Sequence, residues 1–354
     1  MNYFMLPKIT ALNRTNLNGD SLHSLVISLV RGGAAIEVAI AHLRAQAFPG
    51  YKSIVNPNLM FQGLVFLSGF AHQAVVLFFL LSGWLVGGSL LNKTGNENAV
   101  KNYVIDRMTR LWVVLVPAFV LTLIFGILEN KVSMQGIIYS HANEYSAFSF
   151  LGNMLGLQTI FFQNYGYNFS LWSLANETWY YILFPLLLGL VFAKEIYTKF
   201  LSGILILTIA SFVSYPILLF FSLWLLGVVF SRIKIDASRF FQSMFFVVFC
   251  VVAVYFRIKG LNDDLTPDSF IQDAIYSISF LVFLSSLQYE ANLKSSFIKS
   301  IRSIGKLFSE FSFSLYVIHI PIISLIFYYL SLFFNLTKLS SENKLHFMIF
   351  VFIF

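Results

Sequence analysis

The chain has 354 residues, of which 58% are hydrophobic and only 11% are charged, and its formal net charge is +7. Soluble domains carry about 25% charged residues, so this composition excludes a soluble globular fold. Apolar runs of roughly 20 residues recur along the chain, which is typical of transmembrane helices and not of membrane-barrel strands. The positive charge indicates a lipid bilayer as partner, with basic residues in cytoplasmic loops, and gives no reason to expect nucleic acid binding.

We predict an all-α integral membrane protein, formed by a single membrane domain over residues 1–354 with no soluble domain. The predicted helices lie near residues 24–44, 61–91, 111–128, 170–193, 200–214, 216–231, 240–257, 269–288 and 309–334, and a tenth begins at Leu345. The tenth is too short to span a bilayer. The prediction is therefore about ten transmembrane helices, the last one incomplete.

Residues 147–163 form an apolar segment that is almost long enough to be a further span. If this segment does not cross, the basic loops fall on the same side as the N-terminal residues 1–20, and the acidic loop with Asp268 falls on the other. The positive-inside rule therefore favours a re-entrant or interfacial segment, with residues 1–20 and both termini cytoplasmic.

The first predicted helix carries charged residues, among them Arg31 and His42, where a membrane span normally has none. Eleven steps at ~100° per residue place these two side chains ~20° apart around the helix and ~16 Å apart along it. Charged groups inside spans tend to mark function, although Arg31 could snorkel and His42 could be an interfacial anchor. We expect both to face one interior polar cavity.

Five sequence blocks occur in an order that is hard to obtain by chance. They are RGGAAIEVAIAH (31–42), FFLLSGWLVG (78–87), DRMTRLW (106–112), LWSLANETWYYILFP (171–185) and SFSLYVIHIP (312–321). Together they resemble the motifs of the membrane acyltransferase-3 family, which includes O-antigen and exopolysaccharide O-acetyltransferases. Departures from the pattern are Glu37 at a usually apolar position, HQAVVL (72–77) before the second block, and a displaced Pro117.

The resemblance implies a multi-pass enzyme of the bacterial inner membrane that transfers acetyl from acetyl-CoA to a sugar hydroxyl of a glycan or glycolipid precursor. The implied catalytic residues are Glu177 and His42, whose imidazole can act as general base. The implied acyl-CoA ligands are Arg31, Arg107 and Arg110, which suit phosphate. By charge alone, Arg107 and Arg110 fit a positive-inside cluster, and Glu177 could instead pair two helices.

Four further residues are assigned to the substrate or to a supporting role. His319 belongs to the last block, although a histidine inside a membrane protein is more often structural. Ser82 could line a path for the acyl arm or simply allow close helix packing. Trp172 and Tyr181 flank Glu177, and they could instead be interface anchors.

Two other functions stay open at this stage. One is a transporter or flippase, which would move a solute without cleaving a thioester. The other is an acyltransferase that acts on a lipid or a small metabolite. No metal site is expected, because the six histidines lack ligand spacing and Cys250 is the single cysteine.

Overall fold

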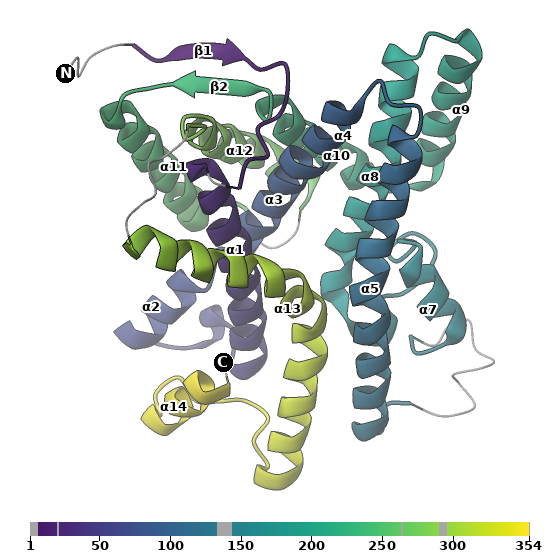
Figure 1. Cartoon of the computed structure of the whole chain (residues 1–354). Coiled ribbons are helices and arrows are strands. Elements are labelled where there is room, and N and C mark those ends of the chain that lie inside the picture. The colour runs from purple at the N-terminus through teal and green to yellow at the C-terminus, as the bar shows by residue number, and fades with distance from the viewer. Residues whose placement is uncertain (1–5, 20, 133–143, 263–264, 290–295, 354) are drawn as a thin grey trace. The chain divides into compact units, whose positions relative to one another are not determined.

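The structure, a computed structural model, describes residues 6–19, 21–132, 144–262, 265–289 and 296–353, without the side chains of residues 296–299 (Figure 1). Helices make up 75% of the described residues. The all-α prediction is therefore correct apart from one pair of short strands. Asp268 lies in the described part. Of the predicted cytoplasmic segment 1–20, residues 1–5 and 20 lie outside the described residues.

Helices and strands carry the labels of Figure 1. The helices are α1 (Leu22–Ala47), α2 (Leu59–Leu67), α3 (Ala71–Ser82), α4 (Gly88–Lys93), α5 (Ala99–Leu128), α7 (Ala147–Met154), α8 (Trp172–Phe192), α9 (Ile196–Phe212), α10 (Tyr215–Phe230), α11 (Arg239–Lys259), α12 (Phe270–Ser285), α13 (Ser296–Phe334) and α14 (Lys344–Ile353). A π-helical turn, η2 (Gly83–Gly87), joins α3 to α4. Helices α5 and α13 begin earlier than predicted, because their polar first turns continue the helix ahead of the apolar run.

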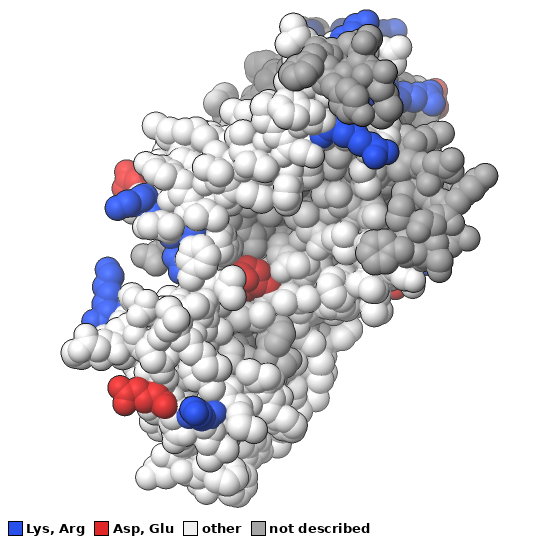
Figure 2. Space-filling view, turned by 90° about the vertical axis from the view of Figure 1, so that its left-hand side faces the viewer, with Lys and Arg blue, Asp and Glu red and all other residues white. Residues whose placement is uncertain are grey.

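Six helical stretches within the described residues are long and apolar enough to cross a membrane. They are Leu22–Ser53, Leu59–Lys93, Ala99–Leu128, Phe169–Phe192, Arg239–Lys259 and Ser300–Phe334. Figure 2 shows one face of the molecule on which charged side chains are few, as expected for a surface in contact with lipid. The chain is a multi-pass membrane protein. The predicted number of ten spans is not confirmed, and the side of each terminus stays a prediction.

The segment at 147–163 contains only a short helix, α7, which has eight residues. At 1.5 Å per residue α7 is ~12 Å long, whereas the hydrocarbon core is ~30 Å thick. After α7 the chain turns back, and Gln158 forms a bridge with Phe162. The segment is therefore not a membrane-spanning helix, and its depth in the membrane stays a prediction.

The predicted helix over 61–91 is interrupted between α2 and α3. Gly69 is a poor helix former, and the hydroxyl of Ser68 donates to the carbonyl of Leu64 at 2.6 Å in the last turn of α2. The amide of Phe70 then donates to Oε1 of Glu37 at 2.8 Å. A carboxylate at a helix N-terminus satisfies a free N–H group and interacts favourably with the helix dipole. Glu37, which departs from the family pattern, thus caps α3.

The chain divides into two compact units. The first unit comprises Met1–Gly33, Val75–Thr109 and Asn176–Phe311, and the second comprises Ala34–Ala74, Arg110–Ala175 and Ser312–Phe354. Helices α1, α3, α5, α8 and α13 have residues in both ranges.

In the first unit, α10 meets α3 and η2 at two glycines. A Cβ atom on Gly83 would lie 2.0 Å from the carbonyl oxygen of Trp224, and one on Gly227 would lie 2.2 Å from that of Leu80. No side chain fits at such distances, so glycine alone permits this backbone contact. The small residues of the second motif block therefore allow close helix packing.

The first unit also contains the two strands, which the sequence analysis did not predict. Strand β1 (Lys8–Ala11) runs antiparallel to β2 (Ile233–Asp236), with Lys8 opposite Asp236. The hydroxyl of Thr15, just after β1, lies 2.9 Å from that of Ser231, just before β2. Four residues are too few to show an alternating pattern, so the pairing depends on the tertiary contact.

In the second unit, the C-terminus of α5 is capped by the backbone. Asn130 adopts a left-handed conformation with φ of 55°. The amide of Lys131 donates to the carbonyl of Gly126 at 2.9 Å, and that of Asn130 donates to Ile127 at 3.0 Å. These two bonds form a Schellman motif, which satisfies the last helical carbonyls and turns the chain sharply.

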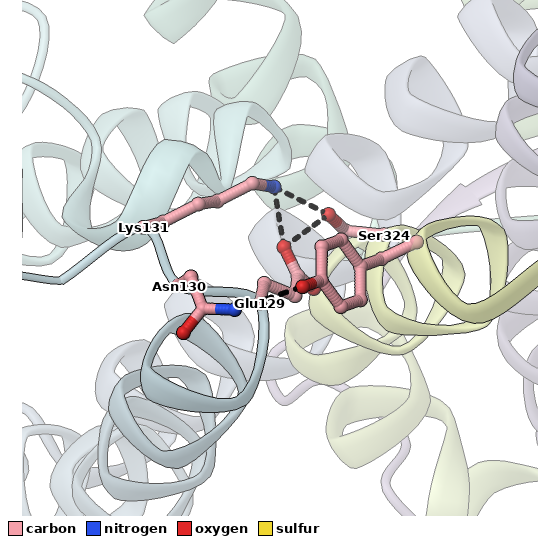
Figure 3. Close-up of polar contacts among 5 residues, drawn as sticks. Glu129, Asn130, Lys131 and Ser324 are labelled. Carbon is pink, nitrogen blue, oxygen red and sulfur yellow. Dashed lines mark hydrogen bonds and ion pairs between the residues drawn. The ribbon is translucent and has the colours of Figure 1, made fainter. Parts of the chain in front are cut away.

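This turn places Lys131 over a buried carboxylate (Figure 3). The ammonium of Lys131 forms an ion pair with Glu129, whose side chain is only 3% exposed. It also donates to the hydroxyl of Ser324 on α13 at 2.8 Å, and Ser324 donates to Glu129 at 3.0 Å. Asn130 donates to the hydroxyl of Tyr328 at 2.9 Å. Polar contacts thus join the end of α5 to α13.

The two partners of this ion pair differ in burial, so we predict an asymmetric response to mutation. Lys131→Met leaves a buried carboxylate without its cation, and it should destabilise the protein by about 1–3 kcal/mol. Glu129→Gln leaves the partly exposed Lys131 solvated and should cost less. Thermal unfolding in detergent measures both, and the double variant should be more stable than Lys131→Met. Equal loss in the two single variants would contradict the prediction.

Candidate active site

Two histidines meet in the second unit. Nδ1 of His42, on α1, lies 2.8 Å from Nε2 of His319, on α13. The ring planes are parallel within 4°. Atoms of stacked rings are ~3.5 Å apart or more, so the shorter nitrogen distance means that the rings meet edge to edge through a hydrogen bond. His319 is buried and His42 is half-buried. Arg44 also interacts electrostatically with His42.

The partners of His319 determine where the protons lie. Its Nδ1 is 2.8 Å from the carbonyl oxygen of Tyr316 and 3.2 Å from that of Leu315. Carbonyl oxygens only accept, so Nδ1 of neutral His319 carries a proton and its Nε2 is an acceptor. Nδ1 of His42 must then donate to His319. Nε2 of neutral His42 is left with a free lone pair.

Nε2 of His42 has no hydrogen-bond partner among the described residues, and it is not fully buried. An unprotonated, accessible imidazole nitrogen is what a general base requires. The ring of Phe169 packs against this imidazole, with the ring centroids 5.0 Å apart at an interplanar angle of 76°. The sequence analysis did not select Phe169, because a phenylalanine in an apolar chain has no distinguishing signal.

A proline near His319 explains part of this arrangement. Pro321 lies inside α13 and has no N–H group, so the carbonyl of Val317 loses its helical donor. The side-chain amide of Asn168 donates to that oxygen at 2.7 Å. Asn168 is completely buried and in turn accepts from Ser170 at 2.7 Å. The segment before α8 is therefore attached to α13 two residues from His319.

Arg31 belongs to the first unit, where its guanidinium donates to the hydroxyl of Ser309 at 3.1 Å. Gly32 beside it allows close packing, because a Cβ there would lie 2.2 Å from Phe308. Both Ser309 and His319 are residues of α13. Arg31 and His42 thus each contact this helix, as two residues on one side of α1 can. The single polar cavity expected for both stays a prediction.

Three other predicted residues form a hydrogen-bonded chain in the first unit. The hydroxyl of Tyr181 donates to Oε1 of Glu177 at 2.5 Å. The hydroxyl of Ser82 lies 3.4 Å from that of Tyr181 and accepts from the indole of Trp224 at 3.1 Å. Ser82 and Tyr181 are buried, so Tyr181 is not an exposed anchor. These contacts hold α3, α8 and α10 together and fix the carboxylate.

Arg107 lies near a buried tyrosine that the sequence analysis did not select. Tyr103, one helical turn before it, is 4% exposed and interacts electrostatically with Arg107 and Glu177. The hydroxyl of Tyr103 and Nε of Arg107 are both buried and have no hydrogen-bond partner within the described part of the chain. These two donors can bind an acceptor atom of a ligand.

The remaining predicted residues are not brought into contact with these groups. Arg110 is exposed, and Trp172 is the half-buried first residue of α8; both belong to the second unit. The described residues include no group of three His, Cys, Asp or Glu side chains that could hold a metal ion.

A half-buried imidazole held by a second histidine is chemically suited to general-base catalysis. The acyltransferase domain family model matches residues 25–354. The chain belongs to the acyltransferase-3 family, as the motif blocks predict.

One relative is a Haemophilus influenzae protein that is 31% identical over 153 residues. The match covers 39% of this chain and 60% of the relative, which is called Uncharacterized protein. The chain thus spans less than two thirds of that relative. No solved structure is significantly similar to this chain.

We predict that the tautomer of His42 depends on an acceptor at the position of Nε2 of His319. In His319→Gln the amide oxygen reaches that position and can still accept from His42. In His319→Asn the amide coincides with Nδ1 and is too short. The glutamine variant should keep most acyl transfer, and the asparagine variant should lose about 100-fold or more in kcat.

¹⁵N NMR of the two variants should show Nδ1 of His42 protonated only where an acceptor remains. Equal activities in the two variants would refute this role.

Proposed function

We propose that the protein is an O-acetyltransferase that transfers acetyl from acetyl-CoA to a hydroxyl of a cell-surface glycan or its lipid-linked precursor. One observation carries the proposal: the hydrogen-bond chain from α13 through His319 leaves Nε2 of His42 unprotonated. A family of membrane acyltransferases needs such a base to activate a hydroxyl. The acetyl group, the glycan and the bacterial inner membrane rest on the motif resemblance.

We propose a direct transfer in which His42 acts as the base, in place of a relay through an acyl-His42 intermediate. Nε2 of His42 takes the proton of the acceptor hydroxyl while the hydroxyl oxygen attacks the thioester carbonyl. The new C–O bond forms, the C–S bond breaks, and the protonated imidazole returns the proton to the leaving thiolate. While His42 is positively charged, its Nδ1–H bond to His319 becomes charge-assisted and therefore stronger. The histidine pair thus favours the charged form that develops during the reaction.

Donor binding is assigned to basic side chains. Arg107 and Tyr103 offer two unpartnered buried donors in the described part of α5, next to the carboxylate of Glu177. Arg110 and Arg31 complete the set that the motif resemblance implies. Guanidinium groups bind phosphate oxygens through pairs of charge-assisted bonds, which suits coenzyme A. In this proposal the arginines and Tyr103 bind the donor, and His42 performs the proton transfer.

The direct test is His42→Ala. Loss of a general base should lower kcat for acetyl transfer by about 10²–10⁴-fold, measured as coenzyme A thiol released by the purified protein and as acetyl content of the glycan by mass spectrometry. His346→Ala is the control, because that ring bonds Ser340 instead. Unchanged transfer in a well-folded His42→Ala protein would remove the proposal.

The donor assignment has its own test. Arg107→Ala should raise the KM for acetyl-CoA by roughly tenfold or more, since bonds to a charged group contribute about 1.5–3 kcal/mol. The KM for the acceptor should change little. Arg239→Ala, an exposed arginine at the start of α11, is the matched control. A donor KM that does not respond to Arg107 would exclude this residue from coenzyme binding.

A further inference from the structure

The segment between α7 and α8, which can be found in Figure 1 by these two labels, contains two consecutive residues in the left-handed conformation. Gly166 and Tyr167 are consecutive residues with φ near +60°. Glycine adopts this conformation freely, but a tyrosine there costs about 1–2 kcal/mol. Such a residue persists only when its surroundings determine it, and strained residues of this kind cluster at ligand sites.

Hydrogen bonds on both sides of Tyr167 hold it in place. The amide of Tyr165 donates to the side chain of Asn153 at 3.0 Å, and that of Gly166 donates to the carbonyl of Glu144 at 3.0 Å. Asn168 is anchored to α13 as described above. The segment, which contains the short 3-10 turns Tyr165–Tyr167 and Phe169–Leu171, is therefore held in place on both sides of Tyr167.

As a consequence, buried and exposed side chains alternate along this segment. Tyr165 and Asn168 are buried, whereas Tyr167 is 55% exposed and Phe169 is 50% exposed. The hydroxyl of Tyr167 is held by Glu144, a hydrogen bond that raises the pKa of Tyr167. The edge-to-face contact of Phe169 with His42 places its open surface beside the proposed base. A group that approaches His42 from this side passes the ring of Phe169.

We propose that Phe169, with Tyr167, forms the acceptor subsite and that its ligand is a pyranose ring of a carbohydrate. The inference rests on the proposed function and adds the residue that selects the acceptor. The C–H groups on one face of a sugar are weakly positive and pack on the negative face of an aromatic ring. Stacking on Phe169 leaves the hydroxyls at the sugar edge, where one can reach Nε2 of His42.

The alternative occupant of an exposed phenylalanine in a membrane protein is a lipid chain. Three features favour the sugar. The ring contacts an imidazole. The neighbouring Tyr167 has a hydroxyl that is hydrogen-bonded to the carboxylate of Glu144, and both groups can bind hydroxyl groups of a ligand. The backbone is fixed, which is useful for orienting a rigid ring and gives little advantage with a flexible chain.

The test compares Phe169→Leu with Phe169→Trp. Leucine keeps an apolar side chain but removes the aromatic face, so the KM for the glycan, freed of its O-acyl groups by mild alkali, should rise roughly 2- to 12-fold. Tryptophan should keep or lower this KM. The donor KM should not change in either variant. Phe161→Leu is the control, because Phe161 is also an exposed phenylalanine of the segment between α7 and α8.

Binding measured without turnover separates this inference from the proposed function. In a His42→Ala background, saturation-transfer NMR with the same de-acylated glycan should show weaker binding when Phe169→Leu is added. That result would support the subsite even if His42 proved not to be the base. An unchanged glycan affinity in Phe169→Leu would overturn the inference. The inference would also be overturned if Phe169→Leu only hydrolysed acetyl-CoA faster. It would equally be overturned if Phe169→Leu lost affinity for dodecanol, which represents a lipid chain, but not for the glycan.

Discussion

A backbone carbonyl inside a membrane must find a donor within the protein, and the second unit is organised around one such carbonyl. Pro321 deprives Val317 of its helical partner, and the buried amide of Asn168 replaces it. This bond fixes the segment before α8 against the same part of α13 that carries His319. The proline thus has a positive consequence, because the broken helical bond becomes the point at which two distant segments are joined.

The histidine pair shows how burial can specify a proton position. His319 faces two carbonyl oxygens on its own helix, so only one of its nitrogens can accept. Through the hydrogen bond to His42, that choice is passed to a second ring. The asymmetry needed for acid–base chemistry therefore comes from the α13 backbone, without a charged residue in direct hydrogen-bond contact with either ring among the described residues.

Several residues that attracted attention in the sequence have packing or capping roles in the structure. Glu37 caps α3. Ser82 bonds Trp224 and lies next to Gly83, where α10 contacts the backbone. These outcomes agree with a general property of membrane proteins, in which small and polar residues often mediate helix contacts. A polar residue in an apolar chain is a good indicator of a constraint, but the constraint need not be catalytic.

Composition and the length of the apolar runs were sufficient to predict a helical multi-pass protein, since the bilayer requires long apolar helices whatever their arrangement. The order of the motif blocks was sufficient for the acyltransferase-3 family. Helical periodicity also placed Arg31 and His42 on one side of α1. The sequence did not predict the β1–β2 pair, the break between α2 and α3, or the position of Phe169. Only tertiary structure decided that His42 meets His319, 277 residues away, and that Asn168 reaches Val317. Hydrogen bonds act over about 3 Å, so they depend on which segments become neighbours in the fold. A single sequence does not give the distances between segments that are far apart along the chain.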